Sequence, residues 1–348
     1  MIEKLTFFYM TICLCIIFFN IVFNVYTKMQ PRFLRHKKKI LKNVLNKHKG
    51  DVLKEKLLKK LGHITYLKVF HELLAEKEVS DIPWHVIGEV MSDLGDCYRA
   101  KKADKKAYFA YVVYALDLNH NMETNSDQLK KAQAKLSTLL KMFLWEEDSL
   151  YVRENAFKAI MSIGIEEDAI EALKMIEKSL RPNNQKLIQN HLLNFTGNHQ
   201  KLADGLYCNL EKFTWPIQVA IVDYLRLVPK EQVHHEFYQA GLYKLLGEKT
   251  QHEELKIELI RYFSKYYYAP VIKNLVEYVQ DKENEELASV AAKALELMSS
   301  NWYVRLNAAE SLLSRGYTYE ELKQRGLDVD ELVTYRQQLQ EIRGREVV

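Results

Sequence analysis

Two distant stretches of this chain repeat one phrase. SLYVRENAFKAIMSIG, residues 149–164, and NWYVRLNAAESLLSRG, residues 301–316, share Tyr-Val-Arg-x-Asn-Ala at the same spacing. Each begins with a suitable N-cap residue, Ser149 or Asn301, and ends at a glycine that can adopt the left-handed conformation just past a helix. The phrase therefore predicts one complete helix in each copy.

The predicted helices need neighbours on both sides. In the second copy, one row of apolar residues follows Val304 at spacings of four and eight, and another follows Leu306 at spacings of three and seven. Alanines such as Ala308 allow a neighbouring helix to approach closely. The first copy is followed by EEDAIEALKMIEKSL, residues 166–180, which completes a helical hairpin. One such hairpin cannot bury its own apolar faces, so the pattern favours an array of stacked hairpins.

The same rhythm continues between the two copies with little identity. Residues 185–298 contain further pairs of amphipathic segments, and Pro216 and Pro270 stand where a new helix would begin. The first helical position tolerates proline because its N–H has no intrahelical partner. With only six prolines and twelve glycines in 348 residues, the composition also favours helices throughout.

These residues resemble the HEAT-repeat family, in particular its bacterial form. Its usual unit is V-R-x-x-A-x-x-A-L-x-x-x-G, followed by a short acidic loop and A-(I/V)-x-x-L, and it is similar to Val152–Leu173 and Val304–Gly316. The resemblance implies an all-α fold, a right-handed α-solenoid of HEAT-like helical hairpins. It also implies side chains that tie adjacent repeats together: Arg153, Asn155, Arg305 and Asn307.

The chain departs from the family pattern at two places. The aspartate that often precedes Val-Arg is replaced by Leu150 and Trp302, and the usual Gly-Asp-Pro after the helix is absent. These departures weaken the expectation of the family's hydrogen bonds between repeats, but they do not weaken the expectation of a solenoid. An alternative role for Arg153 and Arg305 is the binding of a ligand anion.

The N-terminus contains a segment suited to crossing a membrane. Residues 5–27 carry no charged side chain, and a helix of that length is about 34 Å long, enough to span a bilayer. The apolar run exceeds the h-region of a signal peptide, and no small-x-small cleavage site follows it. We therefore expect one uncleaved transmembrane helix.

The basic residues after this segment predict its orientation. Residues 28–49 contain nine Lys/Arg and no acidic residue, so the positive-inside rule predicts a cell-membrane protein with its N-terminus outside and its C-terminal domain in the cytoplasm. Apolar residues recur there at helical spacing, which indicates an amphipathic juxtamembrane helix. The lysines and arginines expected to contact anionic lipid headgroups are Arg35, Lys37, Lys38, Lys39 and Lys42. The alternative is a basic helix that is merely solvated.

Charge separates this stalk from the rest of the chain. Residues 28–60 hold thirteen Lys/Arg against two acidic residues, a local charge of +11. Because the whole chain carries +4 and the first 27 residues are neutral, residues 61–348 carry −7. An acidic body argues against nucleic acid as a partner. The expected domains are the transmembrane helix 5–27, the basic juxtamembrane helix 28–61, N-terminal hairpins 62–145, HEAT-like repeats 146–316, and a helical cap and tail 317–348.

The sequence offers little for catalysis. It has no phosphate-binding glycine loop, HExxH or GxSxG motif, so we expect no catalytic, cofactor or metal residues and no small-molecule substrate. The pair His234 and His235 is interpreted as surface histidines rather than metal ligands, because adjacent helical residues point about 100° apart. Tyr267 and Tyr268, at a turn, are candidates for a protein-partner surface, whereas Phe263 and Tyr266 are expected in the core.

The preferred function is therefore a non-enzymatic, membrane-tethered scaffold that binds membrane-associated proteins, for example in a polysaccharide-synthesising enzyme complex. One alternative is an enzyme or cofactor-handling protein of the HEAT-like lyase or glycosylase type. Another is lipid or nucleic-acid binding through the basic stalk alone.

Overall fold

The chain is helical throughout the part that the structure describes. This computed structural model describes residues 2–76, 83–118, 127–179, 184–247, 252–279, 283–314, 316 and 318–324, and within these ranges it contains helices and turns but no strand. The expected all-α class is therefore confirmed. The chain divides into two compact units, residues 1–175 and 176–348, and the division lies inside helix α8.

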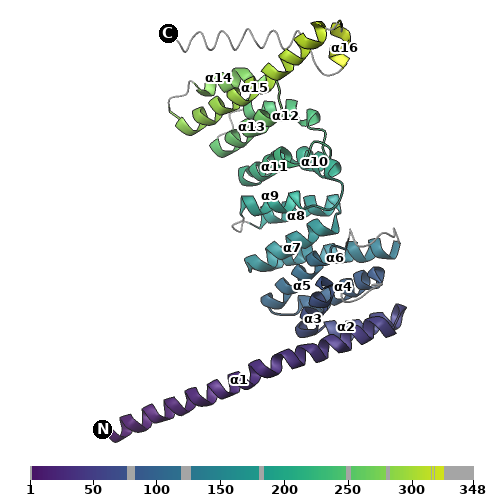
Figure 1. Cartoon of the computed structure of the whole chain (residues 1–348), viewed down its shortest axis with the longest axis vertical. Coiled ribbons are helices and arrows are strands. Elements are labelled where there is room, and N and C mark those ends of the chain that lie inside the picture. The colour runs from purple at the N-terminus through teal and green to yellow at the C-terminus, as the bar shows by residue number, and fades with distance from the viewer. Residues whose placement is uncertain are drawn as a thin grey trace. The chain divides into compact units, whose positions relative to one another are not determined.

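The described residues of the first unit form eight helices, which Figure 1 shows in purple to teal. Their bounds are α1 Ile2–Lys47, α2 Gly50–Leu61, α3 Ile64–Ala75, α4 Trp84–Arg99, α5 Ala103–Ala115, α6 Asp127–Glu146, α7 Leu150–Ile163 and α8 Glu166–Lys178, the last of which continues across the boundary. Apart from α1, they have the lengths of ordinary globular helices.

Helices in this unit pack against the helix two places further along the chain. α2 contacts α4 and α4 contacts α6, while α3 contacts α5 and α5 contacts α7. Sequential neighbours also touch, as α6 and α7 do. The apolar side chains between these helices are shielded from solvent, since Leu57, Phe70, Met91 and Phe109 are fully buried. Each hairpin thus buries its apolar side chains against the next one.

Helix α7 is the first copy of the repeated phrase, and it has the predicted ends. Ser149 precedes it in an extended conformation, and Gly164 ends it with φ 76°. Glycine adopts a positive φ at this position without the steric cost that a residue with a Cβ would meet. Val152, Ala156 and Ile160 are buried in one row, and the helix packs against both α5 and α6. The expected two-sided packing holds for this copy.

Helix α1 joins two segments that the sequence separated. The expected transmembrane helix and the first part of the basic segment form one continuous 46-residue helix, with Pro31 inside it. The juxtamembrane helix expected over 28–61 is instead divided, because α1 ends at Lys47 and α2 begins at Gly50. Gly50 has φ 55°, a conformation that favours glycine and breaks the helical path.

The second unit, green to yellow in Figure 1, continues with shorter helices. Their bounds are α9 Gln185–Leu193, α10 His199–Cys208, a 3₁₀ turn Leu210–Lys212, α11 Trp215–Leu227, α12 Glu236–Gly247, α13 Glu253–Lys265, α14 Val271–Val279, α15 Glu285–Ser314 and α16 Tyr319–Gln324. α9 contacts α11, α11 contacts α13, and α13 contacts α15, so the alternating pattern recurs. The expected cap, 317–348, lies mostly outside the described residues.

The second copy of the phrase does not form a helix of its own. Asn301 was expected to cap a new helix, but it lies inside α15, which runs unbroken from Glu285 to Ser314. No glycine or proline separates Met298 from Tyr303, and a serine or asparagine alone does not end a helix whose neighbours continue it. Only the end agrees with the prediction, where Gly316 has φ 90°.

Candidate membrane-attachment site

The N-terminal half of α1 exposes its apolar side chains. The 40 residues from Phe8 to Lys47 include a stretch that is long and apolar enough to cross a membrane, and none of that stretch is buried against the rest of the protein. Exposed side chains include Phe8, Tyr9, Leu14, Ile17, Phe18 and Phe19. Figure 1 shows this half of α1 projecting away from α2 to α7. Exposed apolar surface of this extent marks a contact with membrane or protein.

The C-terminal half of the same helix is packed. Leu41, Val44 and Leu45 are buried, and α1 contacts α3 and α2. These leucines and the valine lie on the helical stripe that the sequence assigned to the amphipathic face. The apolar side of the basic segment therefore faces the protein body, while Arg32, Arg35 and Lys39 are exposed.

Two of the lysines expected at lipid headgroups also touch α3. The Lys37 ammonium donates a 2.8 Å hydrogen bond to the Thr65 hydroxyl and lies 5.1 Å from the centre of the Tyr66 ring. Lys38 forms an ion pair with Glu76. These contacts fasten the basic segment of α1 to both ends of α3.

The other three expected lipid-contacting residues are arranged differently. Arg35 and Lys39 are exposed, and Lys42 is half-buried. Sequence reasoning did not identify Thr65, Tyr66 or the nearby Lys60, whose ammonium lies 5.4 Å from the same Tyr66 ring. The only sequence signal for them is a tyrosine and a lysine within a short distance of the basic segment, which is too common to be diagnostic.

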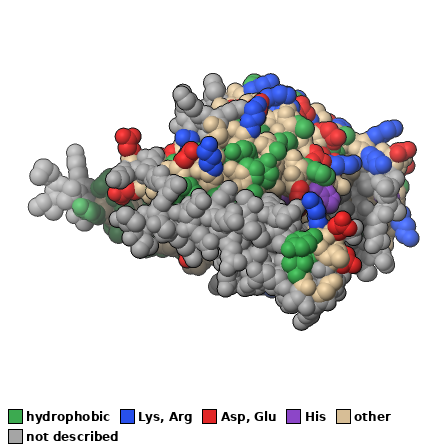
Figure 2. Space-filling view, turned by 90° about the horizontal axis from the view of Figure 1, so that it is seen from above, with side chains coloured by type: hydrophobic (Ala, Val, Ile, Leu, Met, Phe, Trp, Pro, Cys, Tyr) green, Lys and Arg blue, Asp and Glu red, His purple; other side chains and the backbone are tan. Residues whose placement is uncertain are grey.

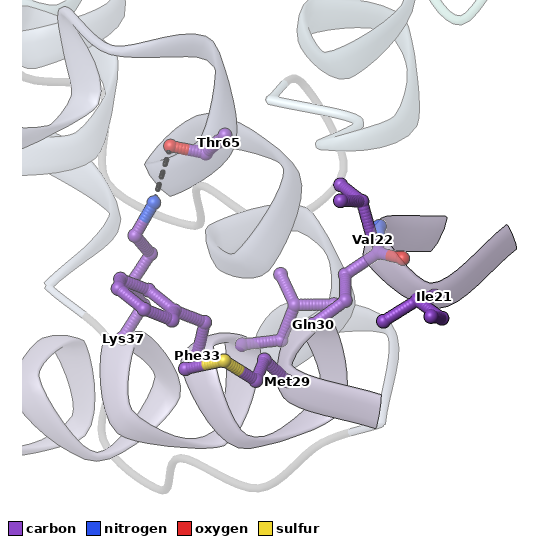
Figure 3. A pocket seen from close by; sticks show the side chains of 8 residues that line it. Ile21, Val22, Met29, Gln30, Phe33, Lys37 and Thr65 are labelled. Atoms are coloured by element: carbon purple, nitrogen blue, oxygen red, sulfur yellow. Dashed lines mark hydrogen bonds between the residues drawn. The ribbon is translucent and has the colours of Figure 1, made fainter. Parts of the chain in front are cut away.

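A cleft opens where α1 leaves α3. It has a volume of about 590 Å³ and is lined by Ile21, Val22, Met29, Phe33 and Leu34, with Lys37 and Thr65 at one end. Figure 3 shows the Lys37–Thr65 hydrogen bond closing this end, while Gln30 and apolar side chains of α1 line the rest. The volume is within the range of small-molecule sites.

The residues expected to tie repeats together are only partly described. The Asn155 side-chain amide donates a 3.1 Å hydrogen bond to the carbonyl of Ala107, which joins α7 to α5. Arg153 is buried on α7. The side chains of Arg305 and Asn307 lie outside the described residues.

The expected partner surface is half-buried. Tyr267 and Tyr268 are both of intermediate exposure, and the Tyr268 ring lies 5.7 Å from that of Tyr243 and 6.0 Å from that of Phe263. Phe263 and Tyr266 are buried, as expected. More exposed aromatic side chains are found elsewhere, at Tyr151 and Phe237.

The histidine pair differs from its interpretation as two surface residues. His234 is exposed, but His235 is buried and stacks on Tyr266 with ring centres 3.7 Å apart. Burial, and to a smaller extent the nearby ammonium of Lys265, lowers the pKa of His235 to about 4. The two residues precede α12, so their side chains diverge, one to solvent and one to the core.

Elsewhere in the body, lysine and arginine side chains form ion pairs with acidic side chains. Lys141 pairs with Asp168, at 2.8 Å, and with Glu171. Glu258 is buried and pairs with Arg226, and its burial raises the pKa of this carboxyl. Among the described residues, no group of three His, Cys, Asp or Glu side chains is placed to hold a metal ion. Figure 2 shows positive and negative side chains interspersed on the described part of one face.

Comparison of the chain with protein-family models, curated proteins and solved structures finds no match.

Proposed function

We propose that this protein is a membrane-tethered, non-enzymatic scaffold whose helical body lies in the cytoplasm and binds membrane-associated proteins. The observation that carries the proposal is the division of α1. Its N-terminal half exposes apolar side chains, whereas its C-terminal half packs on α3 through Leu41, Val44 and Leu45. One continuous helix would therefore connect the bilayer directly to the folded body.

The basic segment supports the orientation. Arg32, Arg35 and Lys39 are exposed on α1 beyond the apolar half, where cations favour the cytoplasmic side. Each cation near an anionic leaflet contributes about 1 kcal/mol. Attachment by both the apolar helix and the cations would hold the body close to the membrane surface.

The packing of the body supports the scaffold role. In the first unit, and along α9, α11, α13 and α15 of the second, helices contact the helix two places along, the pattern that stacked HEAT-like hairpins of an α-solenoid would produce. Such arrays expose extended surfaces suited to protein partners, and tethering raises the effective concentration of partners in the same membrane. Tyr151 and Phe237, 75% and 71% exposed, are candidate contacts, because aromatic residues dominate interface energetics.

Membrane topology is tested by cysteine labelling. Cys97 and Cys208 are both exposed on the body, so a failure to react cannot be attributed to burial. In a full-length Cys13→Ala/Cys15→Ala variant, an impermeant maleimide should label them only after permeabilisation, and the protein should resist extraction with alkaline carbonate. Labelling in intact cells, or extraction by carbonate, would contradict the proposal.

The scaffold role is tested by photo-crosslinking. A photoreactive amino acid placed at Tyr151 or Phe237 should form a discrete crosslink to a membrane protein, and the same crosslink should form in high salt. Lys174, a half-buried residue on α8, provides a control position with less exposed surface. Crosslinks to nucleic acid, or to lipid alone, would favour binding through the basic stalk instead.

A further inference from the structure

The cleft between α1 and α3 combines an apolar wall with a positively charged end. Ile21, Val22, Met29 and Phe33 line the wall, and Lys37 with Thr65 marks the end (Figure 3). Met29 and Phe33 are 50% and 60% exposed, so a ligand can reach them without displacing the protein. An apolar groove that ends in a cation matches a molecule with a hydrocarbon chain and an anionic group.

Two lysines near this end of the cleft have no acidic partner among the described residues. The ammonium groups of Lys37 and Lys60 lie 5.1 and 5.4 Å from the centre of the Tyr66 ring. No Asp or Glu among the described residues pairs with either ammonium, although the neighbouring Lys38 pairs with Glu76. The Tyr66 ring attracts both cations but does not neutralise them, so their charge is available to an anion.

The cleft is also continuous with the apolar half of α1. Ile21 and Val22 belong to the exposed stretch that is suited to a bilayer, and Phe33 stands one helical turn before Lys37. Aromatic side chains commonly lie at the membrane interface, with cations just beyond them. A bilayer lipid at this position would keep its chain on the apolar wall and place its phosphate near the two lysines.

We propose that the α1–α3 cleft binds a single anionic phospholipid, with an acyl chain along Met29 and Phe33 and its phosphate at Lys37 beside Thr65. The inference rests on the proposed membrane tether and deepens it, because it names a specific lipid site in addition to general attraction by the basic segment. Such a lipid would join α1 to α3 at the membrane surface and set the orientation of the body.

The experiment uses the full-length protein in phosphatidylcholine vesicles. A small fraction of the lipid is a phosphatidylglycerol analogue with a diazirine in one acyl chain, and a parallel sample contains the phosphatidylcholine analogue. Illumination should crosslink the anionic probe to Met29 or Phe33, identified by mass spectrometry. The Lys37→Gln variant should reduce this crosslinking about fivefold, the loss expected for one ammonium–phosphate contact, and Lys37→Arg should restore it.

Two further variants distinguish a specific lipid site from general attraction between the basic segment and anionic lipid. Lys47→Gln removes the same charge from an exposed position in the last turn of α1 and should leave the crosslinking unchanged. Thr65→Phe, at an exposed position, fills the cleft without changing the charge and should abolish it. Circular dichroism checks that each variant remains folded.

The proposal is overturned if Lys37→Gln and Lys47→Gln have equal effects, if Thr65→Phe has none, or if the phosphatidylcholine probe reacts equally well. These failures differ from failure of the tether, which alone would release the wild-type protein in alkaline carbonate.

Discussion

The hydroxyl of Tyr98, on α4, donates a 2.9 Å hydrogen bond to the main-chain carbonyl of Leu61, the last residue of α2. Lys101 donates to the next carbonyl, that of Gly62, and its ammonium lies 4.6 Å from the centre of the Tyr98 ring. The last carbonyls of a helix have no intrahelical donor, and a cation there interacts favourably with the helix dipole. One tyrosine–lysine pair therefore closes the end of α2.

The second unit contains the same arrangement. The Tyr266 hydroxyl donates to the carbonyls of Arg226 and Val228, both at 3.2 Å, at the end of α11. Lys265 donates to the Arg226 carbonyl at 2.7 Å and lies 5.1 Å from the centre of the Tyr266 ring. In the first unit Tyr98 belongs to α4, which packs against α2. In the second, Tyr266 directly follows α13, which packs against α11.

Removing either hydroxyl should destabilise the protein. Tyr98→Phe and Tyr266→Phe keep the ring but leave a buried carbonyl without its donor, so each should lower the free energy of unfolding by about 1–2 kcal/mol. Thermal unfolding of the detergent-solubilised protein, followed by circular dichroism, measures the loss. Tyr151→Phe, at a 75% exposed position, is the matched control and should be neutral. Equal melting temperatures for all three variants would show that the hydroxyls do not cap these helices.

Local patterns in the sequence predicted the class of fold and several helix ends. Ser149 and Gly164 flank α7 as expected, although the Ser149 side chain accepts no capping hydrogen bond. The left-handed glycine at the end of the helix is a local preference, which is why the sequence predicts it. Asn301 failed as a cap, because no glycine or proline stands between Met298 and Tyr303 to end the helix that begins at Glu285.

The candidate site could be predicted only in part. The apolar and basic segments of α1 are visible in the sequence, but the contact between Lys37 and Thr65 joins residues 28 positions apart. Its formation depends on α1 continuing through Pro31 and docking on α3. Neither property follows from local periodicity, so the cleft and its second lysine, Lys60, could not be foreseen.

A close approach between α4 and α6 should make Gly95 intolerant of a side chain. A Cβ at this position would lie 2.6 Å from Cδ2 of Leu139, and Leu139 is itself buried, so it has little room to move. Gly95→Ala should therefore cost about 1–3 kcal/mol through overpacking, measured as a lower melting temperature. Gly247→Ala is the control, since its nearest neighbour would be 3.9 Å away. A Gly95→Ala variant as stable as Gly247→Ala would refute this close packing.

The buried imidazole of His235 should make stability depend on pH. Its pKa is about 4 in the folded protein, against an ordinary 6.5, because burial and the ammonium groups of Lys265 and Lys230 oppose its protonation. The Glu236 carboxylate raises the pKa, but by less than these groups lower it. Between these pH values the unfolded chain binds more protons, so stability decreases as pH falls from about 6.5 to about 4. The contribution is at most about 3 kcal/mol.

The variant that isolates this effect is His235→Phe, which keeps a ring against Tyr266 but cannot titrate. The wild type should lose more stability than this variant when the pH is lowered from 7 to 4.5, as read from urea unfolding. His234→Phe, at the exposed neighbouring position, should follow the wild type. Parallel pH curves for the wild type and His235→Phe would exclude His235 as the titrating group.

The two halves of α1 should respond differently to the same kind of truncation. Leu41 is fully buried, whereas Ile17 is 55% exposed. Leu41→Ala opens a cavity where α1 packs on the body and should cost about 2–5 kcal/mol. Ile17→Ala removes no contact within the protein and should leave the melting temperature of the detergent-solubilised chain unchanged.

Proteolysis distinguishes undocking of α1 from a general loss of stability. Once the contacts of Leu41 are weakened, the segment 32–49 should open locally, and trypsin should cleave at its lysines and arginines faster than in Ile17→Ala, at temperatures where the rest of the body remains folded. Cleavage should slow again in anionic vesicles if the membrane supports the docked helix. Equal cleavage rates for the two variants would mean that α1 is attached to the body only by its chain connection, and the proposed rigid link between the membrane and the body would have no support.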